Sequence, residues 1–246
     1  MAKLGIIPAR YASTRFPGKP LIDIDGKTMI QRVYEQACSA SSLDKVVIAT
    51  DDTRIIEEVQ RFGGDYVLTR ADHQSGTDRC AEVAAKITGF DVIINIQGDE
   101  PYIDPVQINL LSSCFEDPDV QLATLIKNIH DDDELFNPNI PKVLINSSQQ
   151  AIYFSRQPIP FIRNEQEKNW AAAHQFYKHI GIYGYTIDAL LQITSLQPSS
   201  LELAESLEQL RWIENGFKIQ TKITALETIA VDTPEDLEKI IRLKGR

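Results

Sequence analysis

The chain has 246 residues, of which 43% are hydrophobic, and a formal net charge of −10. A chain of this length fits one large α/β domain, and its acidic balance argues against general nucleic-acid binding, which needs a basic surface. No apolar run is long enough to cross a membrane, and no signal peptide stands at the start. We therefore expect one cytoplasmic domain over residues 1–246, with no membrane insertion. Three widely spaced cysteines, Cys38, Cys80 and Cys114, are typical of free thiols in a reducing compartment.

Apolar runs alternate with helical patterns over the first 115 residues. The runs predict strands at 4–7, 45–50, 65–69 and 91–97, and the patterns between and after them predict helices at 28–40, 52–63, 75–87 and 105–115. Ser75 and Thr77 are both possible N-caps of the third helix. The alternating order predicts a parallel sheet with right-handed crossovers and helices on both faces.

The second half has a different pattern, with strands predicted at 121–129, 142–146, 151–155 and 179–186 and few helices between them. Residues 129–170 are rich in Asp, Asn, Pro and Gln, which predicts a small antiparallel excursion from the main sheet. One continuous helix is predicted at 201–216, then a strand at 218–225 and a final helix from Thr233. The predicted fold class is therefore α/β, with a mostly parallel central sheet.

The stretch "IIPARYASTRFPGKPL" follows the first strand and contains Arg10, Arg15 and Lys19 beside Gly18. Ligands of open parallel sheets bind at this C-terminal edge, and clustered cations beside a glycine suit phosphate. Neither a Walker A motif nor a dinucleotide fingerprint is present, because the lysine is followed by Pro20 and no G-x-G-x-x-G occurs. The alternative is a basic surface loop without a ligand.

Acidic and small polar residues follow other elements of the predicted sheet. Asp99, in "INIQGDEP", ends a buried strand and could hold Mg²⁺ against a bound phosphate, or be a solvated turn residue. Asp232, in "AVDTPEDL", could be a second metal ligand or merely precede a helix cap. The turn Ser75–Gly76–Thr77 at a helix start could hold an anion or the edge of a base.

Several motifs occur in one order along the chain: the basic loop, "HQSGTDR", "IQGDEP", "FNPN", "YFSR", "HIGIYGY", "LEQLR" and "VDTPEDL". This set resembles the 3-deoxy-manno-octulosonate (Kdo) cytidylyltransferases over residues 6–242. The resemblance implies a Rossmann-like nucleotide-diphospho-sugar transferase fold. It also implies Mg²⁺-dependent transfer of CMP from CTP to the 2-hydroxyl of Kdo, giving CMP-Kdo and pyrophosphate for lipopolysaccharide biosynthesis. Asp78 departs from the pattern, since many relatives carry Glu there.

The resemblance also implies roles for individual residues and a homodimer formed through residues 129–185, a region that would complete the sugar site. The implied catalytic residues are Arg15, Lys19, Asp99 and Asp232, of which the two aspartates would bind Mg²⁺. The implied nucleotide-binding residues are Pro8, Ala9, Arg10, Ser75, Gly76, Thr77 and Gln97. The implied sugar-binding residues are Gln97, Arg156, Arg163, His179, Tyr183, Glu208 and Gln209.

Plainer interpretations stand beside these. His179 could be a strand histidine bonded to a neighbour, Arg156 a surface arginine, and Glu208 with Gln209 a solvated helix face. Two rival functions are a nucleotidylyltransferase for 8-amino-Kdo or sialic acid, which would keep the basic loop, and a non-catalytic nucleotide-binding regulatory domain, which would not need both aspartates.

Overall fold

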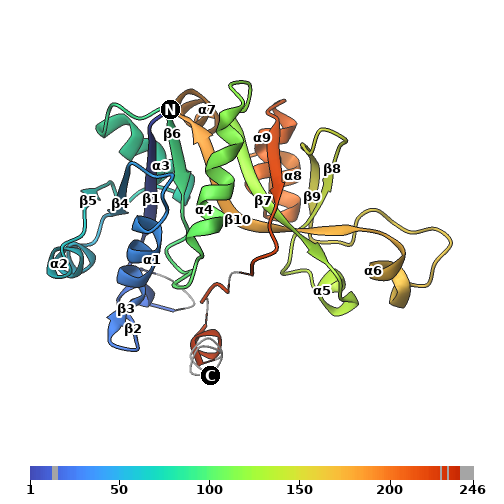
Figure 1. The fold of residues 1–246 in the computed structure, drawn as a ribbon, viewed down its shortest axis with the longest axis horizontal. Helices are drawn as coiled ribbons and strands as arrows, with labels where there is room; N and C mark the ends of the chain where they lie inside the picture. The colour runs from blue at the N-terminus through green and yellow to red at the C-terminus, as the bar shows by residue number, and fades with distance from the viewer. Residues whose placement is uncertain (13–15, 228, 232, 239–246) are drawn as a thin grey trace.

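The computed structural model describes residues 1–12, 16–227, 229–231 and 233–238. Within these residues nine strands form one sheet, and two more form a separate hairpin (Figure 1). The sheet strands are β1 (Lys3–Ala9), β4 (Lys45–Thr50), β5 (Tyr66–Leu68), β6 (Val92–Asn95), β7 (Leu122–Ile129), β8 (Lys142–Ile145), β9 (Ala151–Ser155), β10 (Phe176–Thr186) and β11 (Ile219–Ile223). The hairpin pairs β2 (Asp23–Ile24) with β3 (Lys27–Thr28).

The sheet runs in the order β11-β7-β10-β6-β1-β4-β5, with β8 joined to β10 and β9 to β8. β1 lies between two parallel neighbours, since Ile6 pairs with Val47 of β4 and with Asn95 of β6. β10 runs antiparallel to both β6 and β7. The predicted parallel sheet of the first half is thus confirmed, and the strands β1, β4 and β6 end at one common edge.

Helices cover both faces of this sheet, as predicted. On one face lie α1 (Met29–Cys38), α2 (Thr53–Arg61) and α4 (Pro105–Ser112), which contribute Ile30, Ile55 and Ile108 to one core. On the other lie α3 (Gly76–Lys86), α7 (Ile187–Thr194) and α9 (Gln209–Glu214), which share a second core with Trp212. Because both faces are buried, the central strands are apolar on both sides rather than alternating.

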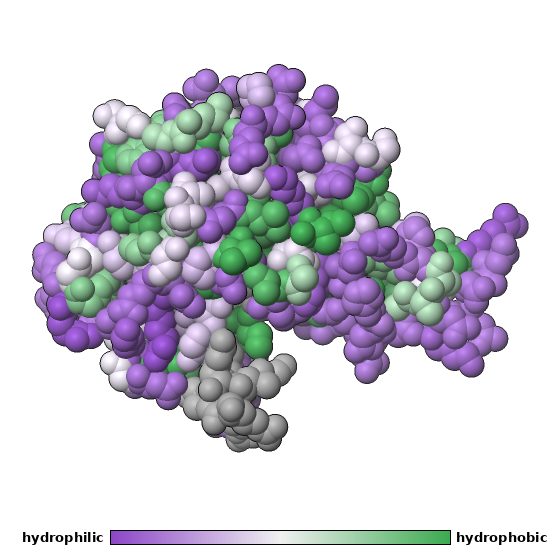
Figure 2. Space-filling model, viewed as in Figure 1, coloured by the Kyte–Doolittle hydropathy of each residue, from purple (hydrophilic) through white to green (hydrophobic). Residues whose placement is uncertain are grey.

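A projection extends from the body beside the β8–β9 hairpin (Figure 1). It contains the first half of β10 with α5 (Asp132–Phe136) and α6 (Trp170–Ala173), and its own apolar cluster includes Leu135, Trp170 and Phe176. The predicted antiparallel excursion is confirmed, because β8 pairs antiparallel with both β9 and β10. Figure 2 shows a mostly hydrophilic face, with apolar areas over the middle of the body and a smaller one on the projection.

The prediction of one continuous helix over 201–216 is wrong. The segment contains two helices, α8 (Ser200–Glu205) and α9, separated at Ser206, whose φ of 52° and ψ of 50° are left-handed. Tertiary bonds overrule the local helical pattern here, because the Glu205 carboxylate accepts from Ser155 Oγ at 2.7 Å and from the Arg156 N–H at 2.9 Å. The predicted end at Gly216 is correct, since this glycine has a φ of 84°.

The last predicted helix is seen at residues 234–238, and the Thr233 hydroxyl accepts from the N–H of Asp236 at 3.3 Å, as expected of an N-cap. Residues 239–246 of that prediction lie outside the described part of the chain. In the part that is described, no helix combines the length and apolar character needed to cross a bilayer.

Candidate active site

A cavity of about 320 Å³ opens where β1 and β6 end and α3 begins. Segments far apart in the sequence meet here, because parallel neighbouring strands bring their exits to the same edge. Eight predicted site residues line it: Pro8, Ala9, Arg10, Lys19, Ser75, Gly76, Gln97 and Asp99. Two further predicted residues, Arg15 and Asp232, lie outside the described residues.

Gly98 allows the exits of β1 and β6 to approach closely. A Cβ atom at this position would lie 2.8 Å from the carbonyl oxygen of Pro8, which is closer than a side chain can come to a main-chain atom without a shift. The basic loop also needs a glycine, because Gly18 has a φ of 74° and donates its N–H to the carbonyl of Tyr11 at 3.0 Å. Both glycines thus shape the cavity wall.

The cavity wall carries both signs of charge. Lys19 Nζ lies 2.8 Å from Asp99 Oδ2, and their side chains are 13% and 27% exposed. Arg10 donates to the carbonyl of His73, and burial, together with the charge of Arg79, lowers the pKa of Arg10. Among the described residues, the predicted cations Arg10 and Lys19 and the predicted metal ligand Asp99 therefore line one cavity.

The start of α3 forms another wall of the cavity. Ser75 is the N-cap of a capping box: the Asp78 N–H donates to the Ser75 hydroxyl at 3.1 Å, and the Ser75 N–H donates to the Asp78 carboxylate at 3.0 Å. Asp therefore completes this box as Glu would. Thr77 is buried and donates from Oγ1 to Glu208 Oε2 at 2.8 Å, which ties the turn to the start of α9.

Sequence reasoning missed Arg79, which is fully buried one turn into α3. Its Nη2 lies 2.7 Å from Asp51 Oδ1, and its Nη1 donates to Thr69 Oγ1 at 2.5 Å. The arginine therefore joins α3 to the segments that leave β4 and β5, behind Arg10. An arginine next to alanines and cysteine in "DRCAEVAAK" was the available signal, because an apolar helix face seldom includes an unpaired cation.

Tyr183 and Gln209 are 9% and 5% exposed, so the alternative of a solvated helix face is wrong for Gln209. Among the described residues, Tyr183 Oη and Gln209 Nε2 are buried polar atoms with no hydrogen-bond partner. Burial raises the pKa of the nearby Glu208, which the bond from Thr77 partly opposes. Buried polar groups left unsatisfied cost stability, and such groups are typical of surfaces shaped for a ligand.

His179 lies on β10 next to an irregularity of its pairing with β7, where Ile180 pairs with Leu125 but Tyr183 pairs with Thr124. The Thr124 hydroxyl donates to the carbonyl of Ile182 at 2.7 Å and lies 3.0 Å from His179 Nε2. Burial lowers the pKa of His179 to about 3, so the ring is uncharged at neutral pH.

The two predicted arginines of the sugar site have different surroundings. Arg156 lies just after β9 and donates to three main-chain carbonyls, those of Glu205, Pro138 and Ser206. Its guanidinium is therefore engaged with the fold rather than being the free surface group of the alternative. Arg163 is exposed on the projection and lines none of the cavities described here.

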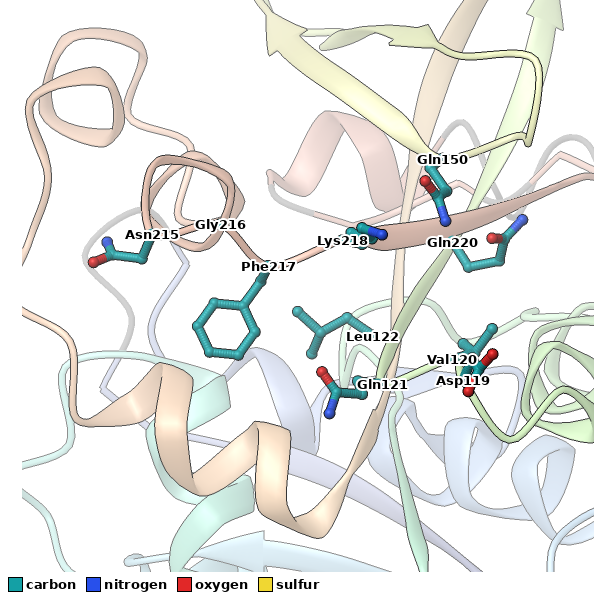
Figure 3. A pocket seen from close by; sticks show the side chains of 10 residues that line it. All are labelled: Asp119, Val120, Gln121, Leu122, Gln150, Asn215, Gly216, Phe217, Lys218 and Gln220. Carbon is teal, nitrogen blue, oxygen red and sulfur yellow. The ribbon is translucent and has the colours of Figure 1, made fainter.

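Two other cavities differ in their relation to these residues. One of about 620 Å³ is lined by Lys178, His179 and Gly181 of β10, by Asn139 of the "FNPN" motif and by the adjacent Ile140. Another of about 440 Å³ lies where β7 and β11 begin, and Figure 3 shows Gln150, Lys218 and Gln220 around it. The latter contains none of the predicted site residues and lies at strand starts, away from the edge where β1 and β6 end.

Comparisons with known proteins show which family the chain resembles. The family model described as cytidylyltransferase matches residues 4–240. The 3-deoxy-manno-octulosonate cytidylyltransferase of Cytophaga hutchinsonii is 59% identical over 239 residues, covering 96% of this chain and 95% of the relative. That of Parabacteroides distasonis is 57% identical over 246 residues, covering 98% and 97%.

Solved structures agree with this result. The structure of CMP:2-keto-3-deoxy-manno-octonic acid synthetase complexed with CTP matches with a TM-score of 0.93 and 45% identity, covering all of this chain and 99% of the other. A putative glucose-1-phosphate thymidylyltransferase from Bacillus anthracis, with a TM-score of 0.63 and 18% identity over 98% of this chain and 95% of the other, shares the fold alone. The predicted fold class is confirmed, and the chain belongs to the cytidylyltransferase family.

Proposed function

We propose that this cytidylyltransferase transfers CMP from CTP to the 2-hydroxyl of Kdo and releases pyrophosphate. The observation that carries the proposal is the shared cavity, in which the cations Arg10 and Lys19, the carboxylate Asp99 and the start of α3 meet. Relatives named for this activity at 59% and 57% identity support the choice of substrates. So does the structural neighbour described as complexed with CTP.

The nucleotide fits the cavity by charge and by shape. Lys19 and Arg10 would hold phosphate oxygens, Ser75 and Gly76 would seat the nucleoside at the start of α3, and Gln97 would lie between nucleotide and sugar. In the reaction the 2-hydroxyl oxygen attacks the α-phosphorus, and the bond to pyrophosphate breaks in line. Fixed cations stabilise the charge that builds on the leaving oxygens. Arg15 is proposed for the same task from the sequence.

The residues present fit a Mg²⁺ site. The Asp99 carboxylate lines the cavity and is 27% exposed, and Mg²⁺ is usually held by one or two carboxylates plus substrate phosphates. Across the described ranges, no three His, Cys, Asp or Glu side chains gather as a metal site, so the proposed ligands are Asp99, Asp232 and phosphate oxygens. When bound, Mg²⁺ would neutralise phosphate charge. Val231, which precedes Asp232 in the sequence, donates its N–H to the Asp99 carbonyl at 2.9 Å.

The acceptor sugar is proposed to bind beside Gln97, against the buried polar atoms of Tyr183 and Gln209. Their unsatisfied Oη and Nε2 atoms match the many hydroxyl groups of a sugar. We also propose Glu208 and His179 as sugar-binding residues. His179 would act as a neutral hydrogen-bonding group because its pKa is about 3. Arg163 stays a prediction from the family resemblance.

We further propose that the chain forms a single domain that pairs with a second copy through residues 129–185. The projection in Figure 1 belongs to this region, and Phe161 is 72% exposed there while packing against Trp170, with ring centroids 5.1 Å apart. Exposed aromatic side chains on an extended element are typical of protein interfaces. The cytoplasmic location stays a prediction.

A substrate screen tests the proposed function. Pyrophosphate release is measured with CTP, UTP and ATP, each crossed with Kdo, 8-amino-Kdo and sialic acid, with and without Mg²⁺. We expect turnover with CTP and Kdo that depends on Mg²⁺. Faster turnover with 8-amino-Kdo or sialic acid would establish the rival acceptor. Binding of CTP without turnover on any acceptor would establish a non-catalytic nucleotide-binding domain.

A further inference from the structure

Two cations, the buried Lys142 and the half-buried Arg156, hold the loop of residues 137–140 through its main chain; this loop contains most of the "FNPN" motif, residues 136–139. Lys142 of β8 is fully buried, and its Nζ donates to the carbonyls of Asn137 at 2.9 Å and Ile140 at 2.6 Å. Arg156 Nη1 donates to the carbonyl of Pro138 at 3.0 Å. Side chains from β8 and from the residue that follows β9 thus fix the main chain on both sides of Asn139, whose own N–H donates to Asn137 Oδ1 at 2.9 Å.

The same arginine joins this loop to the break between α8 and α9. Arg156 Nε donates to the carbonyl of Glu205 at 2.6 Å, and Nη2 donates to that of Ser206 at 3.3 Å. Beyond the break, Glu208 reaches Thr77 at the start of α3. One set of main-chain bonds therefore links the loop beside His179 to the helix that carries Glu208 and Gln209.

Packing alone does not explain a lysine at position 142. Burial lowers the pKa of Lys142 to about 8, and the charge of Arg156 acts in the same direction, while Glu205 opposes it. A methionine has a similar volume and would avoid the cost of burying a cation. Methionine, however, has no hydrogen-bond donor for the two carbonyls and would not fix the loop in one position. The lysine therefore specifies geometry at the expense of stability.

We propose that Lys142 is a positioning residue for the acceptor sugar, acting by holding residues 137–140 so that Asn139 faces the cavity it shares with His179. The inference rests on the proposed function and goes beyond it, because it assigns Asn139 to acceptor contact and Lys142 to the support of that contact. The proposed contact between Asn139 and the sugar lies in the cavity of about 620 Å³ that Asn139 lines together with Gly181 and His179.

The test is a double-variant cycle on the full-length enzyme with CTP, Kdo and Mg²⁺. We expect Lys142→Met to lower kcat/KM for Kdo by about tenfold, as a small misplacement does, while KM for CTP changes less than about twofold. Asn139→Ala should lower the same quantity. The double variant should cost no more than the worse single variant, because both changes remove one contact. Lys45→Met, at a lysine of β4 that pairs with Asp65 and lines none of these cavities, is the control for loss of a cation.

The outcomes separate the inference from its premise. Wild-type turnover that is absent with Kdo would overturn the proposed function before any variant is compared. With an active wild type, multiplicative losses in the double variant, or equal losses toward Kdo and CTP, would show that Lys142 is only structural and overturn the inference. Should Lys142→Met not fold, Arg156→Gln releases the same loop from its other side and is expected to show the same non-additivity with Asn139→Ala.

Discussion

At the scale of single residues, the pair of Lys19 with Asp99 is the most informative contact. Their atoms are 2.8 Å apart at the mouth of the cavity, and neither side chain is fully exposed. The lysine proposed for phosphate and the carboxylate proposed for Mg²⁺ thus form an ion pair with each other. A nucleotide that carries its own negative charge and its own Mg²⁺ would satisfy both groups at once.

Asp99→Asn should therefore abolish most turnover while leaving nucleotide binding intact. The substitution keeps the shape but removes the charged metal ligand, and we expect kcat to fall by more than about 100-fold. The dissociation constant of CTP without Mg²⁺ should stay equal or decrease, because Lys19 is no longer shared with a carboxylate. Asp119→Asn, in the cavity of Figure 3, is the matched control. Full turnover of Asp99→Asn would remove Asp99 from the metal site.

His179 gives a prediction about acid stability. Its pKa is about 3 in the fold, below the ordinary 6.5, so between these values the unfolded chain binds a proton that the folded chain does not. The free energy of unfolding should therefore fall as the pH drops from 6.5 toward 3. His179→Gln should reduce this dependence, whereas His130→Gln, at an exposed position, should not. Urea unfolding between pH 7 and 4.5 measures the difference, and identical slopes for wild type and His179→Gln would contradict it.

At the scale of elements, the break between α8 and α9 shows a tertiary contact defeating a local pattern. The stretch "LELAESLEQLRWIENG" has the leucine spacing of one helix, yet Ser206 has a left-handed conformation. The Glu205 carboxylate and the Arg156 guanidinium fix the chain there against the end of β9. Beyond the break, Glu208 at the start of α9 contacts Thr77 of α3.

Ser206→Gly should stabilise the protein. A non-glycine residue in the left-handed region costs about 1–2 kcal/mol, while added chain freedom in the unfolded state costs about 0.5–1 kcal/mol. We therefore expect the free energy of unfolding to rise by about 0.5–1 kcal/mol, measured by urea unfolding. Ser195→Gly is the control, since Ser195 follows α7 with a right-handed φ of −85° and should lose stability. A loss at Ser206 would contradict the argument.

At the scale of the whole molecule, the projection stands out because it leaves aromatic side chains exposed. Phe161 and Phe136 are 72% and 36% exposed, while Trp170, whose ring contacts both of theirs, is 4% exposed. The projection thus has a small core of its own and an outer apolar surface. This arrangement favours association with a second copy through residues 129–185.

Phe161→Asp should convert a dimer into a monomer. A charge placed in the centre of an apolar contact is costly to bury, so association should weaken by at least about 100-fold. Sedimentation at micromolar concentration measures the oligomeric state, and Leu203→Asp, at a residue 70% exposed on α8, is the control outside the region. A wild type that sediments as a monomer, or a Phe161→Asp variant that remains dimeric, would contradict the proposed interface.

The sequence by itself determined the main-sheet strands and the helices of the first half, the parallel order of that sheet, and the cation-rich loop after β1 with its Gly18, but not the β2–β3 hairpin. These are local properties, since apolar spacing, caps and turn residues act within a few neighbours. Only the tertiary structure decided that Lys19 meets Asp99, that Arg156 holds main-chain carbonyls, and that Tyr183 and Gln209 are buried with unsatisfied atoms. Such outcomes depend on contacts between residues tens of positions apart. The energies of such tertiary contacts can exceed the local helix propensity, as the break between α8 and α9 at Ser206 demonstrates.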